Sequence, residues 1–282
     1  MKPRQLLHRI ETIQRIVKIT KAMEIVASTQ LRKLELKFTS IEAYAENIEK
    51  IIEDIYLLYR SFPNPWFRAR SDGNILIVVI GSDRGLCGAF NVELLTRVKE
   101  MMREYEQEGK RIVDIIPVGK KCTSYCRRIY EKEGLVNYSG REKEFAEILS
   151  EKIISSYQEE KVDNVFVISS LYKKTGREKI MVEKILPLEF KIPERKGLNI
   201  DWLTEPEWES FLTQIIPYYI KYKLLYKLME SRLAEELSRM LAMKYATENG
   251  EEMVSNLTLK YHRARQAQIT TEILEIIQGV EV

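Results

Sequence analysis

The chain has 282 residues, of which 45% are hydrophobic, so it can form one large domain or a domain with an extended element. Its 45 lysines and arginines nearly balance 42 acidic residues, and a net charge of +3 gives no reason to expect nucleic-acid binding. No run of about 18 apolar residues occurs and the N-terminus lacks an apolar signal core, so we expect no direct membrane insertion.

The N-terminal segment, residues 1–62, predicts one long coiled-coil helix. Arg4 to Phe62 contains neither glycine nor proline, and its apolar residues recur in alternating steps of three and four. A sustained heptad repeat of this kind predicts a left-handed coiled coil. The repeat comprises Ile10, Ile13, Val17, Thr20, Glu24, Ala27, Leu31, Leu34, Phe38, Ile41, Ala45, Ile48, Ile52, Ile55 and Tyr59.

Residues 73–190 predict a central module in which strands alternate with helices. The prolines and the Asp-Gly pair between residues 61 and 73 end the first helix. The pattern predicts strands at 74–80, 111–118, 135–138, 164–169 and 178–186, and helices at 92–108, 119–132 and 142–160. Such alternation is typical of a Rossmann-like α/β fold with a mostly parallel sheet, and we expect the last strand at an edge.

The loop from Gly81 to Asn91 follows the first strand, where phosphate-binding loops often lie. Its glycines do not match the dinucleotide fingerprint, and no Gly-Lys-Ser/Thr follows, so we expect no cofactor. Cys87 is conceivable as a nucleophile, but both histidines of the chain lie in the terminal helices. We expect a tight turn that exposes Asp83 and Arg84 to a partner, and no catalytic or metal site.

Two further cysteines, Cys122 and Cys126, are spaced to share one face of a helix. The simplest interpretation is that they are small core or surface residues. A regulatory disulfide or a metal pair is the alternative, although no third cysteine or nearby histidine completes a metal site.

The C-terminal segment, residues 206–282, predicts a second long helix. Tyr218 to Gln278 contains no proline and one glycine, which would allow about 90 Å of unbroken helix. Its apolar stripe is interrupted at Glu236, Thr247 and Gly250, which suggests partner-facing positions, and Asn249-Gly250 is a turn signal that marks a local weakness. Two such stripes at opposite ends of the chain predict an antiparallel coiled coil that flanks the α/β module.

Four segments in order along the chain resemble the gamma subunit of the rotary ATP synthase. They are Thr12 to Lys33, Ser82 to Asn91, Leu237 to Gly250 and Arg263 to Gly279. The resemblance implies a non-catalytic central stalk that rotates inside a ring of alpha and beta subunits and couples ion flow to ATP synthesis or hydrolysis. It also implies contacts with the epsilon subunit and the c-ring, and a peripheral location on the cytoplasmic face of the bacterial inner membrane.

The resemblance also assigns roles to individual residues. It implies that Arg239, Arg265 and Gln266 contact beta-subunit loops, with Met23 and Thr270 beside them. If the matching motifs of the two helices lie level, Met23 faces Arg239, paired residue numbers add to about 262, and residues beyond about 260 outrun the N-terminus. The overhanging tip is apolar on several sides and predicts a bearing enclosed by partners. The bearing comprises Ile269, Ile273, Ile276, Ile277 and Val280.

Two other classes of protein remain open from the residues. A helical adaptor or scaffold of another complex would explain the long helices but not the four ordered motifs. A Rossmann-type enzyme with helical arms would explain only the central module. The chain departs from the family pattern at Gln30, where lysine is usual, and at His262, where asparagine is usual.

Overall fold

A computed structural model of the chain describes residues 3–58, 65–67, 70, 73–173, 179–189 and 208–280; residues 55, 57–58, 208–210 and 275–280 are described as backbone only. The chain forms two compact units. The rod unit contains Met1–Thr29 and Arg239–Val282, and the module unit contains Gln30–Ser238. Each unit takes one segment from each terminal helix.

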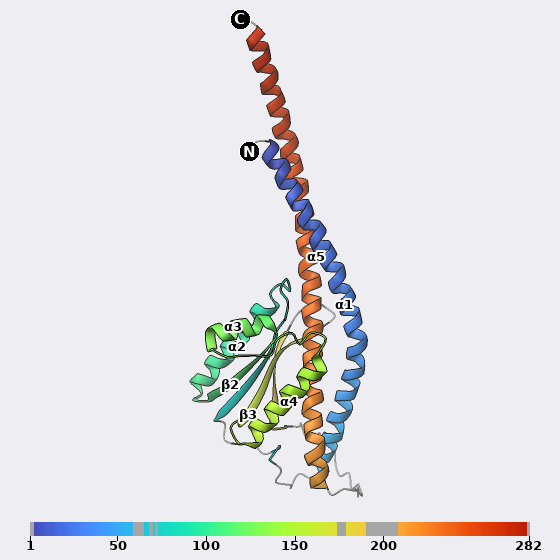
Figure 1. The fold of residues 1–282 in the computed structure, drawn as a ribbon, viewed down its shortest axis with the longest axis vertical. Coiled ribbons are helices and arrows are strands. Elements are labelled where there is room, and N and C mark those ends of the chain that lie inside the picture. Colours follow the sequence, from blue (N-terminus) through green and yellow to red (C-terminus); the bar gives the residue numbers. More distant parts are fainter. Residues whose placement is uncertain are drawn as a thin grey trace. The chain divides into compact units, whose positions relative to one another are not determined.

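Two long helices form the ends of the chain, as predicted. Helix α1 spans Pro3–Leu58 and helix α5 spans Trp208–Val280. In the rod unit the two helices lie side by side and run in opposite directions (Figure 1). Their contact is apolar: Leu6 and Ile10 of α1 pack with Leu257 of α5 in one buried cluster. The helix continues through Gly250 despite the Asn-Gly turn signal, as the prediction of one long helix requires.

The module unit contains a four-stranded sheet in the order β2-β1-β3-β4. Its strands are β1 (Asn74–Ile80), β2 (Arg111–Val118), β3 (Asn164–Leu171) and β4 (Lys179–Leu186). Strand β1 pairs in parallel with β2 and β3, whereas β4 pairs antiparallel with β3 at the edge. The mostly parallel sheet and the edge position of β4 are confirmed.

The strand predicted at residues 135–138 is wrong. Only Leu135 makes a single bridge to Val118, and the chain turns away at Asn137, which has a φ of 61°. A left-handed residue breaks the extended conformation that a strand requires. The N–H of Asn137 is bonded to Asp83 instead of to a neighbouring strand.

Helices cover the two faces of the sheet. They are α2 (Phe90–Gln107), α3 (Lys120–Tyr130) and α4 (Glu142–Gln158). Alternate residues of β1 (Ile75, Ile77 and Val79) form one core with α2 and α3. Cys122 and Cys126 are buried in this core as free thiols, which confirms their interpretation as small core residues. A hydrogen bond to Cys126, together with burial, raises the pKa of the Cys122 thiol.

The other residues of β1 (Leu76, Val78 and Ile80) are equally buried and therefore face the opposite side of the sheet. The chain crosses from β1 to β2 in one direction and then from β2 back past β1 to β3 in the other. If both connections are right-handed, as is usual, α4 in the second connection lies on this second side. Helix α5 also lies here, because Ser231 Oγ donates to the Ile80 carbonyl over 3.2 Å. Residues 227–237 of α5 are buried on every side of the helix. A helix that is buried all round has no single apolar face, so its heptad repeat is less regular in the sequence than that of α1.

Candidate functional site: partner-facing surfaces

The register of the rod unit is fixed by two close contacts between its helices. Thr20 Oγ1 and Thr247 Oγ1 lie 2.8 Å apart in a buried hydrogen bond. A Cβ added at Gly250 would lie 2.5 Å from Val17 Cγ2, so the absence of a side chain there lets α1 approach closely. In both pairs the residue numbers add to 267.

The predicted register, with a sum of about 262, is therefore wrong by five residues. Met23 lies about level with Lys244 and not with Arg239. Apolar spacing could not supply this correction, because neighbouring turns of the two stripes offer similar contacts. The threonine pair and the glycine gap select one alignment. The overhang of α5 consequently begins near residue 265.

The five predicted contact residues fall into separate places. Arg265, Gln266 and Thr270 are exposed at the start of the overhang, where Thr270 Oγ1 donates to the Gln266 carbonyl over 2.9 Å. Met23 is half-buried and lies level with Lys244, which is 21 residues before Arg265 on α5. This separation corresponds to about 32 Å along the helix. Arg239 is buried, with 5% of its surface exposed. One partner loop therefore cannot touch all five residues.

The predicted bearing is exposed as far as its side chains are described. Ile269 and Ile273 are both exposed, and Leu274 extends the same apolar tip. The side chains of Ile276, Ile277 and Val280 lie outside the described residues. Three large apolar residues on a helix without a neighbouring helix call for a protein partner around them.

The outer surface of α1 in the rod unit carries a further apolar group that the sequence analysis missed. Ile16, Ile19, Ile25 and Val26 are each more than half exposed. They stand outside the heptad seam, and this is the signal that could have revealed them. A stable two-helix rod in water would place polar residues there, so this surface is suited to burial against another protein.

The glycine loop of the module unit is fixed from within by Asp83. Its carboxylate accepts hydrogen bonds from the backbone N–H groups of Lys120, Asn137 and Ser139 at 3.0, 2.8 and 2.9 Å, and from Ser139 Oγ at 2.7 Å. Burial acts to raise the pKa of Asp83, but these hydrogen bonds outweigh it and hold the pKa below its ordinary value. The expectation that Asp83 is exposed is wrong.

Fixing Asp83 presents the next residues outward. Arg84 is exposed, as predicted, and Leu86 is exposed with a φ of 63°. Cys87 is buried, and Asn91 Nδ2 donates to both its Sγ and Ser82 Oγ. A buried thiol is not accessible to a substrate and is therefore not suited to nucleophilic catalysis.

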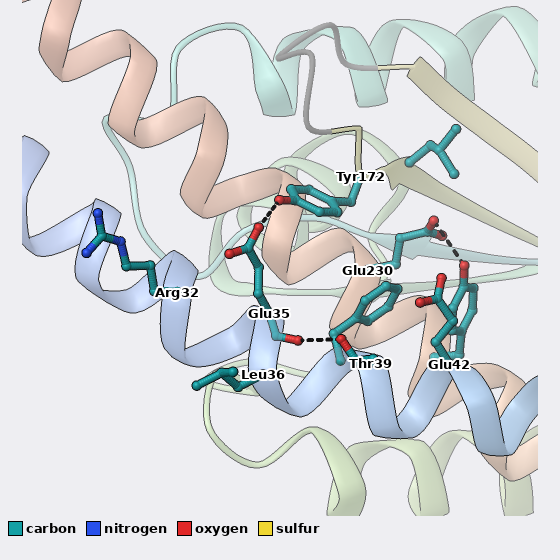
Figure 2. Close-up of a pocket in the computed structure, with 10 residues that line it drawn as sticks. Arg32, Glu35, Leu36, Thr39, Glu42, Tyr172 and Glu230 are labelled. Atoms are coloured by element: carbon teal, nitrogen blue, oxygen red, sulfur yellow. Dashed lines mark hydrogen bonds between the residues drawn. The ribbon is translucent and has the colours of Figure 1, made fainter.

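A pocket of about 730 Å³ in the module unit lies between α1, the end of β3 and α5 (Figure 2). Figure 2 shows Tyr172 hydrogen-bonded to Glu35. Tyr226, which also lines the pocket, donates a hydrogen bond to Glu230. Burial and Glu35 raise the pKa of Tyr172, so the phenol stays a donor at neutral pH. The first contact ties the end of β3 to α1, whereas the second lies within α5.

Two lysines of α5, the partly buried Lys223 and the buried Lys227, connect this helix with β4. Lys223 Nζ lies 2.8 Å from Glu49 of α1 and 3.0 Å from Glu183 of β4. Lys227 Nζ lies 2.6 Å from Glu183 and 3.2 Å from Glu230. These alternating charges link β4, at the edge of the sheet, to both α1 and α5. They therefore hold the sheet against the two long helices within the module unit.

Two classes of site are absent from the described part of the chain. Among these residues, no group of three histidine, cysteine or acidic side chains is placed to hold a metal ion. None of the described helices combines the length and apolar character that crossing a membrane requires.

The comparisons with known proteins agree over nearly the whole chain. The ATP synthase family matches residues 2–282. The ATP synthase gamma chain of Pelotomaculum thermopropionicum is 33% identical over 284 residues, covering 98% of this chain and 97% of that protein. The gamma chain of Geotalea uraniireducens is 29% identical over 280 residues, with coverages of 97% and 96%.

Solved structures show the same fold. A chain from the Euglena gracilis mitochondrial ATP synthase, from a structure of OSCP, F1 and c-ring, matches with a TM-score of 0.67 at 18% identity, covering 99% of this chain and 93% of that one. A chain from the central stalk and c-ring of the Tetrahymena thermophila enzyme gives 0.61 at 22% identity, with coverages of 81% and 99%.

Proposed function

Because this chain belongs to the gamma-subunit family of the ATP synthase, whose members are non-catalytic central-stalk subunits, we propose that it rotates inside a ring of three alpha and three beta subunits. Its rotation couples ion flow across the membrane to ATP synthesis or hydrolysis on the beta subunits. The observation that carries this proposal is the rod unit, a rigid helix pair whose outer surface is apolar where water would favour polar residues.

The rod unit is suited to a moving contact. Its exposed apolar groups on α1 and at the tip offer burial without fixed hydrogen-bond partners, so a rotating surface has few directional bonds to break. Arg265, Gln266 and Thr270 form the polar contact at the start of the overhang, and Met23 serves a separate contact lower on the rod. Arg239 is buried, so it supports this surface from inside and does not touch the partner directly. Ile269 and Ile273 begin the bearing, which Ile276, Ile277 and Val280 complete.

The module unit provides the other partner surfaces in this proposal. Its outward loop, with Arg84 at the turn, meets a partner while Asp83 holds the loop from inside. The epsilon subunit and the c-ring bind the module and the lower helices. The chain is then a peripheral subunit on the cytoplasmic face of the bacterial inner membrane.

Rotation is tested with the complete chain assembled with its alpha and beta subunits. All three native cysteines are buried, so a bead needs an introduced thiol. Glu133→Cys is suitable because the Glu133 side chain is 80% exposed. Stepped rotation in one direction under ATP is expected, and the chain without the substitution should bind no bead. A complex that hydrolyses ATP without turning would refute the shaft function.

The contact at the overhang has a matched control in the chain. Arg265 and Arg263 are both exposed on α5 and are two residues apart, so they point about 200° apart around the helix. Arg265→Gln is expected to lower ATP turnover of the assembled complex, whereas Arg263→Gln leaves it near the original rate. Equal effects of the two substitutions would reduce the contact to general surface charge.

A further inference from the structure

A cationic groove of about 450 Å³ lies in the module unit, next to the acidic pocket of Figure 2, with which it shares Leu36. Four segments enclose it: α1, the glycine loop, the turn before α4, and α5. Its positive side chains are Lys33, Lys37, Arg84 and Arg232. The volume falls within the range of about 300–1,000 Å³ that is usual for small-molecule sites.

The charges at the rim of the groove are not neutralised. Lys33 and Lys37 are four residues apart and share one face of α1. Within the part of the chain that the structure describes, neither of these lysines nor Arg84 forms an ion pair. The one carboxylate in the lining, Glu142, already accepts the Gly140 N–H over 2.7 Å.

The floor of the groove carries a buried guanidinium. The Arg232 side chain is 7% exposed; its Nη1 lies 2.7 Å from Glu235 and its Nη2 lies 3.0 Å from Glu236. Its Nε is buried and has no acceptor among the described residues. A buried donor without an acceptor costs about 1–3 kcal/mol, so the guanidinium beneath the rim has incomplete hydrogen bonding and adds positive charge to the floor.

We propose that this groove is a binding site for a phosphate-bearing small anion of the oligophosphate class. Three unpaired cations converge from two elements, and guanidinium and ammonium groups are the usual ligands of phosphate oxygens. Leu34 and Met229 provide an apolar wall for a body attached to the phosphates. A small anion fits the groove better than an acidic polypeptide does, because the volume between the four segments is that of a small-molecule site.

The test measures binding of inorganic tripolyphosphate to the purified full chain by titration calorimetry. One site per chain is expected. The Lys33→Gln/Lys37→Gln pair and Arg84→Gln should each weaken binding about tenfold or more, because a hydrogen bond between charged groups is lost. The control pair Lys18→Gln/Lys260→Gln removes the same charge from exposed lysines of the rod unit and should change affinity less than twofold. Circular dichroism confirms that each variant retains its helices.

Three results would overturn the proposal. The first is no binding at millimolar tripolyphosphate. The second is equal weakening by the groove pair and the control pair, which would reduce the effect to net charge. The third is an octaglutamate peptide that binds more tightly than tripolyphosphate and loses affinity in the same groove variants, which would make the groove a docking site for an acidic polypeptide.

Discussion

The rod unit and the module unit use the same two helices in opposite ways. In the module unit, α5 buries charged side chains such as Lys227, Glu230 and Arg232, and each has an ionic partner inside the unit. In the rod unit, large apolar side chains of α1 and α5 are exposed instead. The buried ion pairs hold the sheet against the long helices, whereas the exposed apolar residues of the rod unit are suited to burial against another protein. Four substitutions test this contrast, and three further changes serve as controls or backgrounds.

The largest loss of stability is expected in the module unit from Lys227→Met. This change removes the ionic partner of the buried Glu230, which among the described residues keeps only the Tyr226 hydroxyl, and one ionic partner of Glu183. Breaking a buried ion pair from one side costs about 3–5 kcal/mol, because a buried carboxylate loses the positive charge that balances it. Urea unfolding followed by tryptophan fluorescence measures it, since the tryptophans at 66, 202 and 208 all belong to this unit.

Lys244→Met in the rod unit is the matched control. Lys244 lies 3.9 Å from Glu248, and both side chains are more than half exposed. Exposed pairs of this kind contribute at most about 0.5 kcal/mol. A similar loss from the two substitutions would contradict the contrast between the units.

A smaller loss, about 1–3 kcal/mol at neutral pH, is expected from Asp83→Asn, because an amide replaces a carboxylate that accepts four hydrogen bonds. The folded-state pKa of Asp83 lies below its unfolded value, so its contribution is complete above about pH 4. It is lost as the pH falls through the folded pKa. Unfolding curves of the original chain and the variant should therefore converge in acid; a constant difference down to pH 2 would exclude this role of the charge.

Gly250→Ala tests the close approach that sets the register of the rod unit. The new methyl group would lie 2.5 Å from Val17 Cγ2, and overpacking costs about 1–3 kcal/mol. The better helix propensity of alanine returns about 1 kcal/mol, which leaves a net loss of about 1 kcal/mol. In a Val17→Ala background the same substitution should stabilise the helix pair. Hydrogen exchange of the rod segments measures both, and the same sign in both backgrounds would contradict the observed register.

Met23→Lys is expected to change stability least, by less than about 0.5 kcal/mol, because Met23 is only half-buried and a lysine can extend into water. It should nevertheless lower the ratio of ion pumping to ATP hydrolysis in membrane vesicles. Gln14→Lys adds the same charge at an exposed position of α1 and should leave this ratio unchanged. Unchanged coupling in an intact Met23→Lys complex would remove Met23 from the rotor contacts.

The sequence was most informative where one physical rule governed a long segment. The heptad seam of α1 reappears as buried residues at Ile10, Ala27, Leu31 and Phe38. Continuous apolar runs gave the strands β1 and β3. The exposed group that includes Ile16 and Ile19 was visible as apolar residues outside the seam, but periodicity alone directs attention to the seam itself.

Several features required partners distant in the sequence. Asp83 looked exposed because it lies in a glycine-rich turn, yet its acceptors are filled from residues 37 to 56 positions away. The charge alternation through Lys223 and Lys227 joins β4 to the long helices, and no local pattern predicts such a pairing. The failed strand at 135–138 belongs to the same class, since Asp83 accepts the N–H of Asn137 that a strand would have used.

By itself, the sequence determined the two long helices, their antiparallel pairing and the mostly parallel sheet, because helix and strand periods repeat over many residues and local sterics enforce them. Only the tertiary structure decided the register of the rod, the inward turn of Asp83 and the burial of charges along α5. These depend on single contacts, such as Val17 against Gly250 and Thr20 with Thr247. A single contact leaves no repeating pattern in the chain, so its energy is realised only when distant segments meet.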